Sequence, residues 1–256
     1  MGNWRIKLAL VFTALNTIGI IAIIPYDLTL MGNQSVSGDI PPSLIIIINS
    51  TVQALYMFGM ILVGLRLQNR TGLNAPILNG MVYHKTRVHI SKKWLINSMV
   101  VAIIGSLIVI LLDLFVFHPL MEAATDQLAS PNWWQGLLAS IYGGVTEEIM
   151  LRLFGMTLIV WVLAWITKKQ KGDIPNNFYY IAIFLVAILF GLGHLPAAAQ
   201  VFSGLSAVIV IRTMVLNGLL GLWFGYLYWK RGLEYAIIAH MSADIFLHVL
   251  IVPILY

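Results

Sequence analysis

Long runs of apolar residues, interrupted by short polar loops, dominate the chain from one end to the other. A stretch of about 20 apolar residues is long enough to cross the hydrocarbon core of a bilayer as an α-helix. Stretches that reach or approach this length are 6–25, 43–65, 94–116, 133–167, 178–194, 205–229 and 233–254. The pattern therefore predicts an all-α fold, a polytopic bundle of transmembrane helices with seven spans.

Two of these runs need a further decision. The first follows Arg5 and Lys7 as a secretory signal would, but it is too long and lacks a small-residue cleavage site, so we expect a retained helix. The run 133–167 is too long for one upright span, so it should be tilted, broken near Gly155 or extended out of the membrane. A break there would give an eighth span.

Lysine and arginine residues are concentrated in alternate connections. They occur in the loop 66–93, in the loop 168–177 and at Lys230 and Arg231, whereas the connections near 27–42, 117–132 and 195–204 contain none. The positive-inside rule then predicts a cytoplasmic N-terminus. We expect an integral membrane protein, of a bacterial cell membrane.

Composition narrows the class of protein further. Only 10% of the residues are charged, against about 25% in a soluble domain, and 60% are hydrophobic. The net charge of +5 does not indicate a nucleic-acid partner, because the basic residues lie in the loops that set the topology. The chain has no cysteine, which excludes disulfides, cysteine-ligated zinc and a thiol nucleophile.

Adjacent glutamates and an arginine interrupt the fourth apolar run, where charged side chains are costly and commonly functional. Glu148 and Arg152 are four residues apart, so on a helix they share a face and can pair. Glu147 points about 100° away and is free for another partner. We interpret Glu147 as a general base and Glu148–Arg152 as an orienting pair. The alternative is that both glutamates only pair with Arg152 and Arg212 to hold helices together.

Further polar residues interrupt two later runs. His194 follows two glycines and precedes a proline, where a helix frays; as a single residue it is more typical of an interhelical hydrogen bond than of a ligand. His240 and Asp244 share a helix face, which His248 continues by one turn. This stripe could bind a metal, relay protons or line a polar seam. Asp113 and Arg212 are expected to form a structural ion pair.

Together the three motifs resemble, in order and spacing, those of the CPBP (CAAX protease and bacteriocin-processing, or Abi) intramembrane proteases. The pattern Glu-Glu-x-x-x-Arg is Glu147-Glu148…Arg152, Phe-x-x-x-His is Phe190…His194, and His-x-x-x-Asp/Asn is His240…Asp244. The similarity covers roughly 136–248. We therefore divide the chain into N-terminal transmembrane helices, 1–130, with the basic loop 66–93, and a catalytic helical core, 131–256.

The resemblance implies a helix bundle around a polar intramembrane chamber and hydrolysis by a glutamate-activated water. Glu147 and His194 would polarise the water, while His240 and Asp244 would stabilise the oxyanion or hold a metal. An asparagine, as in the eukaryotic CAAX proteases, can donate a hydrogen bond to an oxyanion, which an ionised aspartate cannot do. Asp244 thus favours a divalent metal such as zinc, held by some of these four residues, or a contact that orients His240. A metal-free glutamate mechanism remains the alternative.

The function expected from these motifs is that of an intramembrane endopeptidase. Its substrate would be a membrane-associated peptide or protein, either of CAAX type or a bacteriocin or pheromone precursor. The alternative is a non-catalytic protein of bacteriocin self-immunity, or one that binds a partner at the polar seam. A transporter is disfavoured because the sequence shows no internal repeat. Nothing in the sequence requires an oligomer.

Overall fold

A computed structural model describes residues 3–31, 42–84, 88, 90–121, 131–202 and 204–251, and the described residues form helices and turns but no strand. The elements are α1 (Asn3–Met31), α2 (Pro42–Thr71), α3 (Pro76–Asn79), η1 (Gly80–His84), α4 (Lys92–Leu112), η2 (Asp113–Phe117), η3 (His118–Leu120), α5 (Trp133–Ile141), η4 (Tyr142–Glu147), η5 (Ile149–Met156), α6 (Thr157–Ile166), α7 (Asn176–Gly193), α8 (Leu195–Val201), α9 (Ala207–Lys230), α10 (Leu233–Asp244) and η6 (Ile245–Ile251). Of the elements labelled η, η3 is a 3₁₀-helix and the others are π-helical.

Seven helical segments of the described residues are long and apolar enough to cross a membrane, as the hydrophobic pattern predicts. They are Ile6–Leu30, Ser43–Thr71, Lys92–Leu120, Trp133–Ile166, Asn176–Val201, Ala207–Lys230 and Leu233–Ile251. Lys85 and Arg87 of the predicted basic loop, and positions 252–254 of the last predicted span, lie outside the described residues.

The second span extends six residues beyond its predicted end at position 65, because polar side chains there are buried rather than solvated. The Gln68 amide donates to the Tyr228 hydroxyl at 3.0 Å, and the Tyr179 hydroxyl donates to the Thr71 carbonyl at 2.6 Å. These partners lie on α9 and α7, far away in the sequence. Hydropathy alone therefore places the end of this helix too early.

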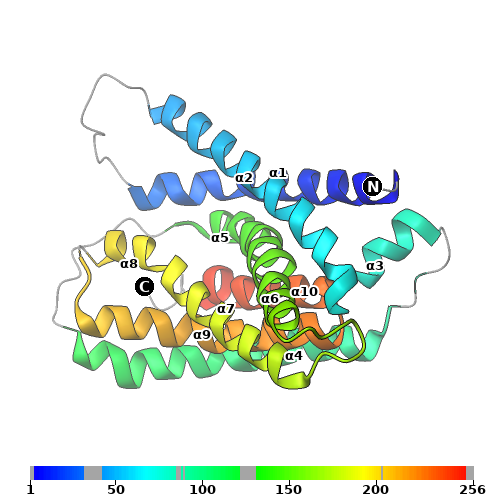
Figure 1. The fold of residues 1–256 in the computed structure, drawn as a ribbon. Coiled ribbons are helices and arrows are strands. Elements are labelled where there is room, and N and C mark those ends of the chain that lie inside the picture. The colour runs from blue at the N-terminus through cyan, green and yellow to red at the C-terminus, as the bar shows by residue number, and fades with distance from the viewer. Residues whose placement is uncertain are drawn as a thin grey trace.

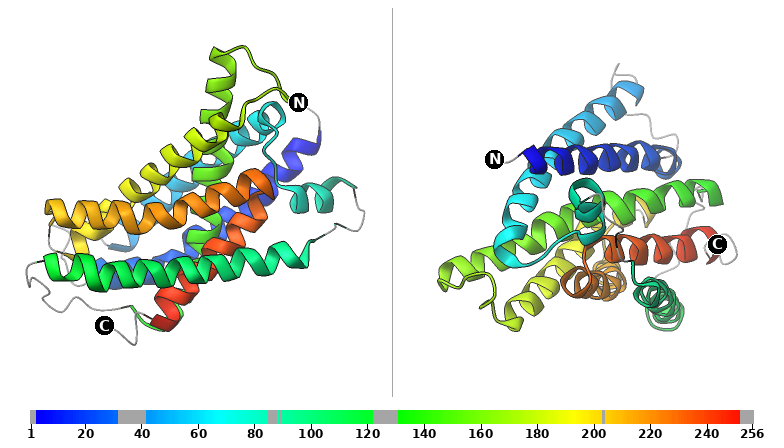
Figure 2. Two further views of the ribbon diagram at one scale, coloured as in Figure 1. Left: turned by 90° about the horizontal axis from the view of Figure 1, so that it is seen from below. Right: turned by 90° about the vertical axis from the view of Figure 1, so that its right-hand side faces the viewer.

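The fourth span is one continuous run of helix from Trp133 to Ile166, without the break near Gly155 that would create an eighth span. Its 34 residues correspond to about 50 Å of helix, more than the ~30 Å hydrocarbon core. The run is π-helical through η4 and η5, so extra residues are absorbed by wider turns instead of a break. Figure 2 (left) shows its α6 end projecting beyond the neighbouring helices, with α7 returning antiparallel to it.

Helix α10 lies inside the bundle, between α5 with η4 on one side and α4 with α9 on the other (Figure 1). Helices α1 and α2 cover the opposite face of α5, η4 and η5. Close approach of α10 depends on glycines: a side chain at Gly144 would collide with Met241 and with the Ile237 carbonyl. Residues on η4 and α10 are thereby brought into direct contact.

The predicted ion pair between Asp113 and Arg212 is confirmed. The Arg212 guanidinium donates two hydrogen bonds, from Nε at 2.6 Å and from Nη2 at 2.5 Å, to the two oxygens of the Asp113 carboxylate. Such a bidentate pair has a fixed geometry. It joins η2 to α9 and leaves Arg212 unavailable to the glutamates of the fourth span.

Candidate active site

Glu148 and Arg152 form the buried pair that their spacing predicts. Both side chains are fully enclosed, and Arg152 Nη1 lies 3.0 Å from Glu148 Oε1. Arg152 Nη2 also donates to the Gly221 carbonyl on α9 at 2.9 Å. The guanidinium carbon lies 5.4 Å from the centre of the Phe190 ring and 5.5 Å from that of Phe224, within cation–π range. The Arg152 guanidinium is therefore fixed by contacts with α7 and α9, and it in turn fixes the position of the Glu148 carboxylate.

The Glu148 carboxylate in turn fixes the ring of His240. His240 Nδ1 lies 2.8 Å from Glu148 Oε1, and the ring is almost entirely buried. Phe224 stacks on the imidazole with 4.5 Å between ring centres, and Phe190 meets it edge-on at 5.3 Å. With Nδ1 donating to the Glu148 carboxylate, the other ring nitrogen, Nε2, is free to contact other groups. The orienting contact that Asp244 was considered for is therefore made by Glu148.

Glu147 and Asp244 both face this second nitrogen of His240. Glu147 Oε2 lies 3.7 Å and Asp244 Oδ1 lies 3.6 Å from Nε2. Both distances are too long for a direct hydrogen bond. A side chain at Gly143 would meet His240 Nε2 and collide with Asp244, so the glycine keeps the space beside these groups open. Two carboxylates and one imidazole nitrogen thus converge on one small polar space.

His194 lies near this group but makes a different contact from the one expected. Its Nδ1 is 2.8 Å from the Phe190 carbonyl, one turn back on α7. The Phe190 ring packs edge-on against both His194, at 4.7 Å between centres, and His240. The two imidazoles therefore share one aromatic neighbour. Among the described residues no hydrogen bond or ion pair joins His194 to Glu147, so their shared action on a water stays a prediction.

The zinc site predicted for Glu147, His194, His240 and Asp244 also stays a prediction, and the geometry does not favour it. In the part of the chain that the structure describes, no group of three or more histidine, aspartate or glutamate side chains is arranged to hold a metal ion. Zinc sites place at least three protein ligands at about 2.0–2.2 Å from one point. We therefore derive no catalytic step through a metal.

Two contacts from the N-terminal helices to the site were missed by the sequence analysis. The Tyr26 hydroxyl of α1 lies 3.5 Å from His248 Nδ1, one turn beyond Asp244. The Gln53 amide of α2 donates to the Tyr142 hydroxyl at 2.7 Å, and Tyr142 begins the π-helix that ends at Glu147. The polar residues in otherwise apolar runs could have indicated these contacts, but their partners are set only by the packing.

Carboxylate and imidazole groups thus meet inside a bundle of helices that are long and apolar enough to cross a membrane. Residues 129–246 match the family model "Type II CAAX prenyl endopeptidase Rce1-like", and this segment contains all three motifs. No curated protein and no solved structure matches the chain.

The segment 129–246 belongs to the Rce1-like family of type II CAAX prenyl endopeptidases, which confirms the resemblance to the CPBP proteases. The chain thus combines a segment of an endopeptidase family with seven helices, among the described residues, that are long and apolar enough to cross a membrane. The match begins close to residue 131, where we divided the chain, although it does not test that division.

Proposed function

We propose that the protein is an intramembrane endopeptidase that hydrolyses a membrane-associated peptide or protein with a water activated by Glu147. The observation that carries this proposal is the convergence of Glu147 Oε2 and Asp244 Oδ1 on His240 Nε2, at 3.7 and 3.6 Å. These distances are too long for direct hydrogen bonds, so both carboxylates and the imidazole nitrogen can contact one water that lies beside all three groups.

In the proposed reaction, Glu147 removes a proton from the water while the water oxygen attacks the scissile carbonyl carbon. The protonated Glu147 then transfers this proton to the leaving amine as the carbon–nitrogen bond breaks. His240 is held by Glu148 and Phe224, so its Nε2 can contact the reacting oxygen without reorganisation. Glu148 and Arg152 are positioning residues in this scheme.

We assign to Asp244, in its protonated form, a hydrogen bond to the oxyanion. A carboxylic acid can donate this bond, whereas a carboxylate would repel the developing charge. Asn has the same shape and is also a donor, so Asp244→Asn should keep peptide-cleavage activity within about tenfold of wild type. Asp244→Ala should lose about 10²–10³-fold in kcat, the effect of removing an oxyanion donor.

The Asp244 variants, together with two measurements on the wild-type protein, decide between this scheme and a zinc enzyme. Activity of the wild-type protein should survive dialysis against a strong chelator, and elemental analysis should find no stoichiometric metal. An inactive Asp244→Asn variant, together with one equivalent of zinc in the wild type, would contradict the oxyanion role and restore the metal proposal. Residual activity is measured as the initial rate on a quenched fluorogenic peptide.

We propose a bacterial cell membrane and a cytoplasmic N-terminus for this protein, on the basis of the alternating basic connections. The turn between α6 and α7, which contains Lys168, Lys169 and Lys171, would then face the cytoplasm. A cysteine introduced at Gly172, an exposed position, should be protected from a membrane-impermeant maleimide in intact cells. Labelling from outside would reverse the topology.

The substrate class that we propose is a precursor of CAAX type or a bacteriocin or pheromone precursor. The test is to co-express candidate precursors with wild-type protein or with Glu147→Ala and to map the products by mass spectrometry. A new terminus that appears only with the wild type supports proteolysis. Processing or protection that persists with Glu147→Ala, at equal expression, would favour the non-catalytic immunity or partner-binding role.

A further inference from the structure

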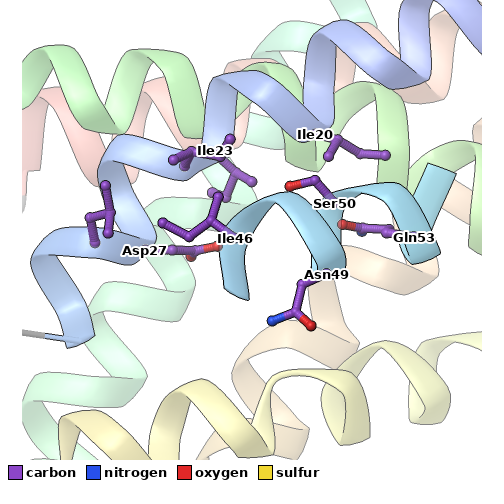
Figure 3. Close-up of a pocket in the computed structure, with 9 residues that line it drawn as sticks. Ile20, Ile23, Asp27, Ile46, Asn49, Ser50 and Gln53 are labelled. Carbon is purple, nitrogen blue, oxygen red and sulfur yellow. The ribbon is translucent and has the colours of Figure 1, made fainter. Parts of the chain in front are cut away.

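A crevice of about 90 Å³, lined by both apolar and polar residues, lies between the C-terminal half of α1 and the N-terminal half of α2. Figure 3 shows its walls: Ile20, Ile23 and Asp27 on α1, and Ile46, Asn49, Ser50 and Gln53 on α2. The two helices cross near their middles and diverge toward these ends (Figure 1). The crevice lies on one side of this crossing, between the end of α1 and the start of α2.

The crevice is bounded on one side by α2, which packs on α1, η5 and α6 but leaves much of its N-terminal half exposed. Only 11% of the most apolar window of α2 is buried, compared with 44% for the span that carries the glutamates. Polar groups on such a helix would face lipid, where an unsatisfied polar group is costly. Gln53 donates to the Tyr142 hydroxyl, but among the described residues the Asn49 and Ser50 side chains on the wall of the crevice make no hydrogen bond. A ligand with polar groups would satisfy them.

Asp27 is the only acidic residue of α1 and α2, and it is exposed in the crevice. No hydrogen bond or ion pair joins it to another described residue. The nearest basic residue of α1 is Lys7, about 30 Å from Asp27 along the helix axis, and the nearest of α2 is Arg66, about 20 Å along the axis from Gln53. Asp27 is thus a carboxylate in a membrane-spanning segment without a cation, and such a residue is expected to have a functional partner.

Both walls of the crevice are connected to the helices that carry the proposed catalytic groups. On α2, Gln53 donates to the Tyr142 hydroxyl, which lies close enough to interact electrostatically with both Glu147 and Asp27. On α1, Tyr26, next to Asp27, lies 3.5 Å from His248. The crevice is therefore joined by two side-chain contacts to the helical spans that carry Glu147 and Asp244.

We propose that this crevice is a substrate subsite for a lysine or arginine side chain a few residues from the scissile bond. The isoleucines would cover the aliphatic part of that side chain, and Asp27 would pair with its charged end while Ser50 accepts a further hydrogen bond. This inference rests on the proposed endopeptidase function and adds a determinant of specificity to it.

The test uses the full-length protein in detergent or vesicles and a set of quenched fluorogenic peptides. One lysine is moved through a host sequence of alanine, leucine and serine, and each peptide has a twin with glutamine at that position. For the wild type, one lysine position should raise kcat/KM by about tenfold over its glutamine twin, as one additional charge-assisted contact would. In Asp27→Asn this ratio should fall to near one. In Asp27→Lys, a further peptide with glutamate at the same position should be cleaved faster than the lysine peptide.

Asp173→Asn is the matched control, because Asp173 is an exposed aspartate in the turn between α6 and α7, and it should keep the wild-type ratio. Equal ratios at every position in the wild type, or an unchanged ratio in Asp27→Asn, would overturn the subsite. If the wild type cleaves no peptide, the proposed function fails instead. In that case the dissociation constants of the same peptides test the subsite separately. The lysine peptide should bind more tightly than its glutamine twin to the wild type but not to Asp27→Asn.

Discussion

Replacement of Glu147 by glutamine is expected to lower kcat for peptide hydrolysis by about 10³-fold or more, near the upper range for loss of a general base. Glutamine keeps the shape of the side chain but cannot take a proton from water. The Glu147 side chain is only partly enclosed, at 17% exposure, and its oxygen is 3.7 Å from the nearest nitrogen of His240. Its replacement should therefore leave the fold intact. Initial rates on a quenched peptide, with thermal unfolding of the same samples, measure both effects.

The neighbouring glutamate provides a sharp comparison for this result. Glu148→Gln removes a buried charge that pairs with Arg152 and holds His240, so it should lower both stability and activity. Glu147→Gln should lower activity and leave stability unchanged. The exposed substitution Asp173→Asn controls for a general effect of losing a negative charge. A Glu147→Gln protein that turns over at close to the wild-type rate would contradict the assignment of the general base.

Features of the fold that depend on local sequence could be predicted. The spans follow from runs of apolar residues, because a helix of about 20 such residues is the element that satisfies its own backbone in a bilayer. The pairing of Glu148 with Arg152 follows from their separation of four residues. The number of spans and this ion pair are accordingly both found in the structure.

Features that depend on packing between distant helices could not be predicted in the same way. That Glu148, rather than Asp244, orients His240 follows from how η4 and η5 lie against α10, at a distance set by Gly144. The π-helical turns that present the two glutamates have no simple periodic signal in the sequence. The contact of His194 Nδ1 with the Phe190 carbonyl depends on how the end of α7 turns, which the sequence pattern does not specify.

Substitution of Arg152 by methionine is expected to have the largest effect on stability, about 3–5 kcal/mol, the loss typical when one partner of a buried ion pair is removed. Arg152 is fully buried, and its loss leaves the Glu148 carboxylate enclosed without a cation and the Gly221 carbonyl without its donor. Methionine keeps much of the volume between Phe190 and Phe224, so the effect reports charge more than packing. Unfolding in a graded series of denaturing detergent measures it.

The double variant Glu148→Gln, Arg152→Met separates stability from catalysis. It removes both buried charges, so its loss of stability should be smaller than that of Arg152→Met alone, since no uncompensated carboxylate remains. Its activity should stay low, because a neutral amide accepts a weaker hydrogen bond from His240 Nδ1 than the carboxylate does and so holds Nε2 less firmly in place. If stability and activity both returned in the double variant, the pair would be structural only, and the orientation of His240 would have to come from its stacking on Phe224.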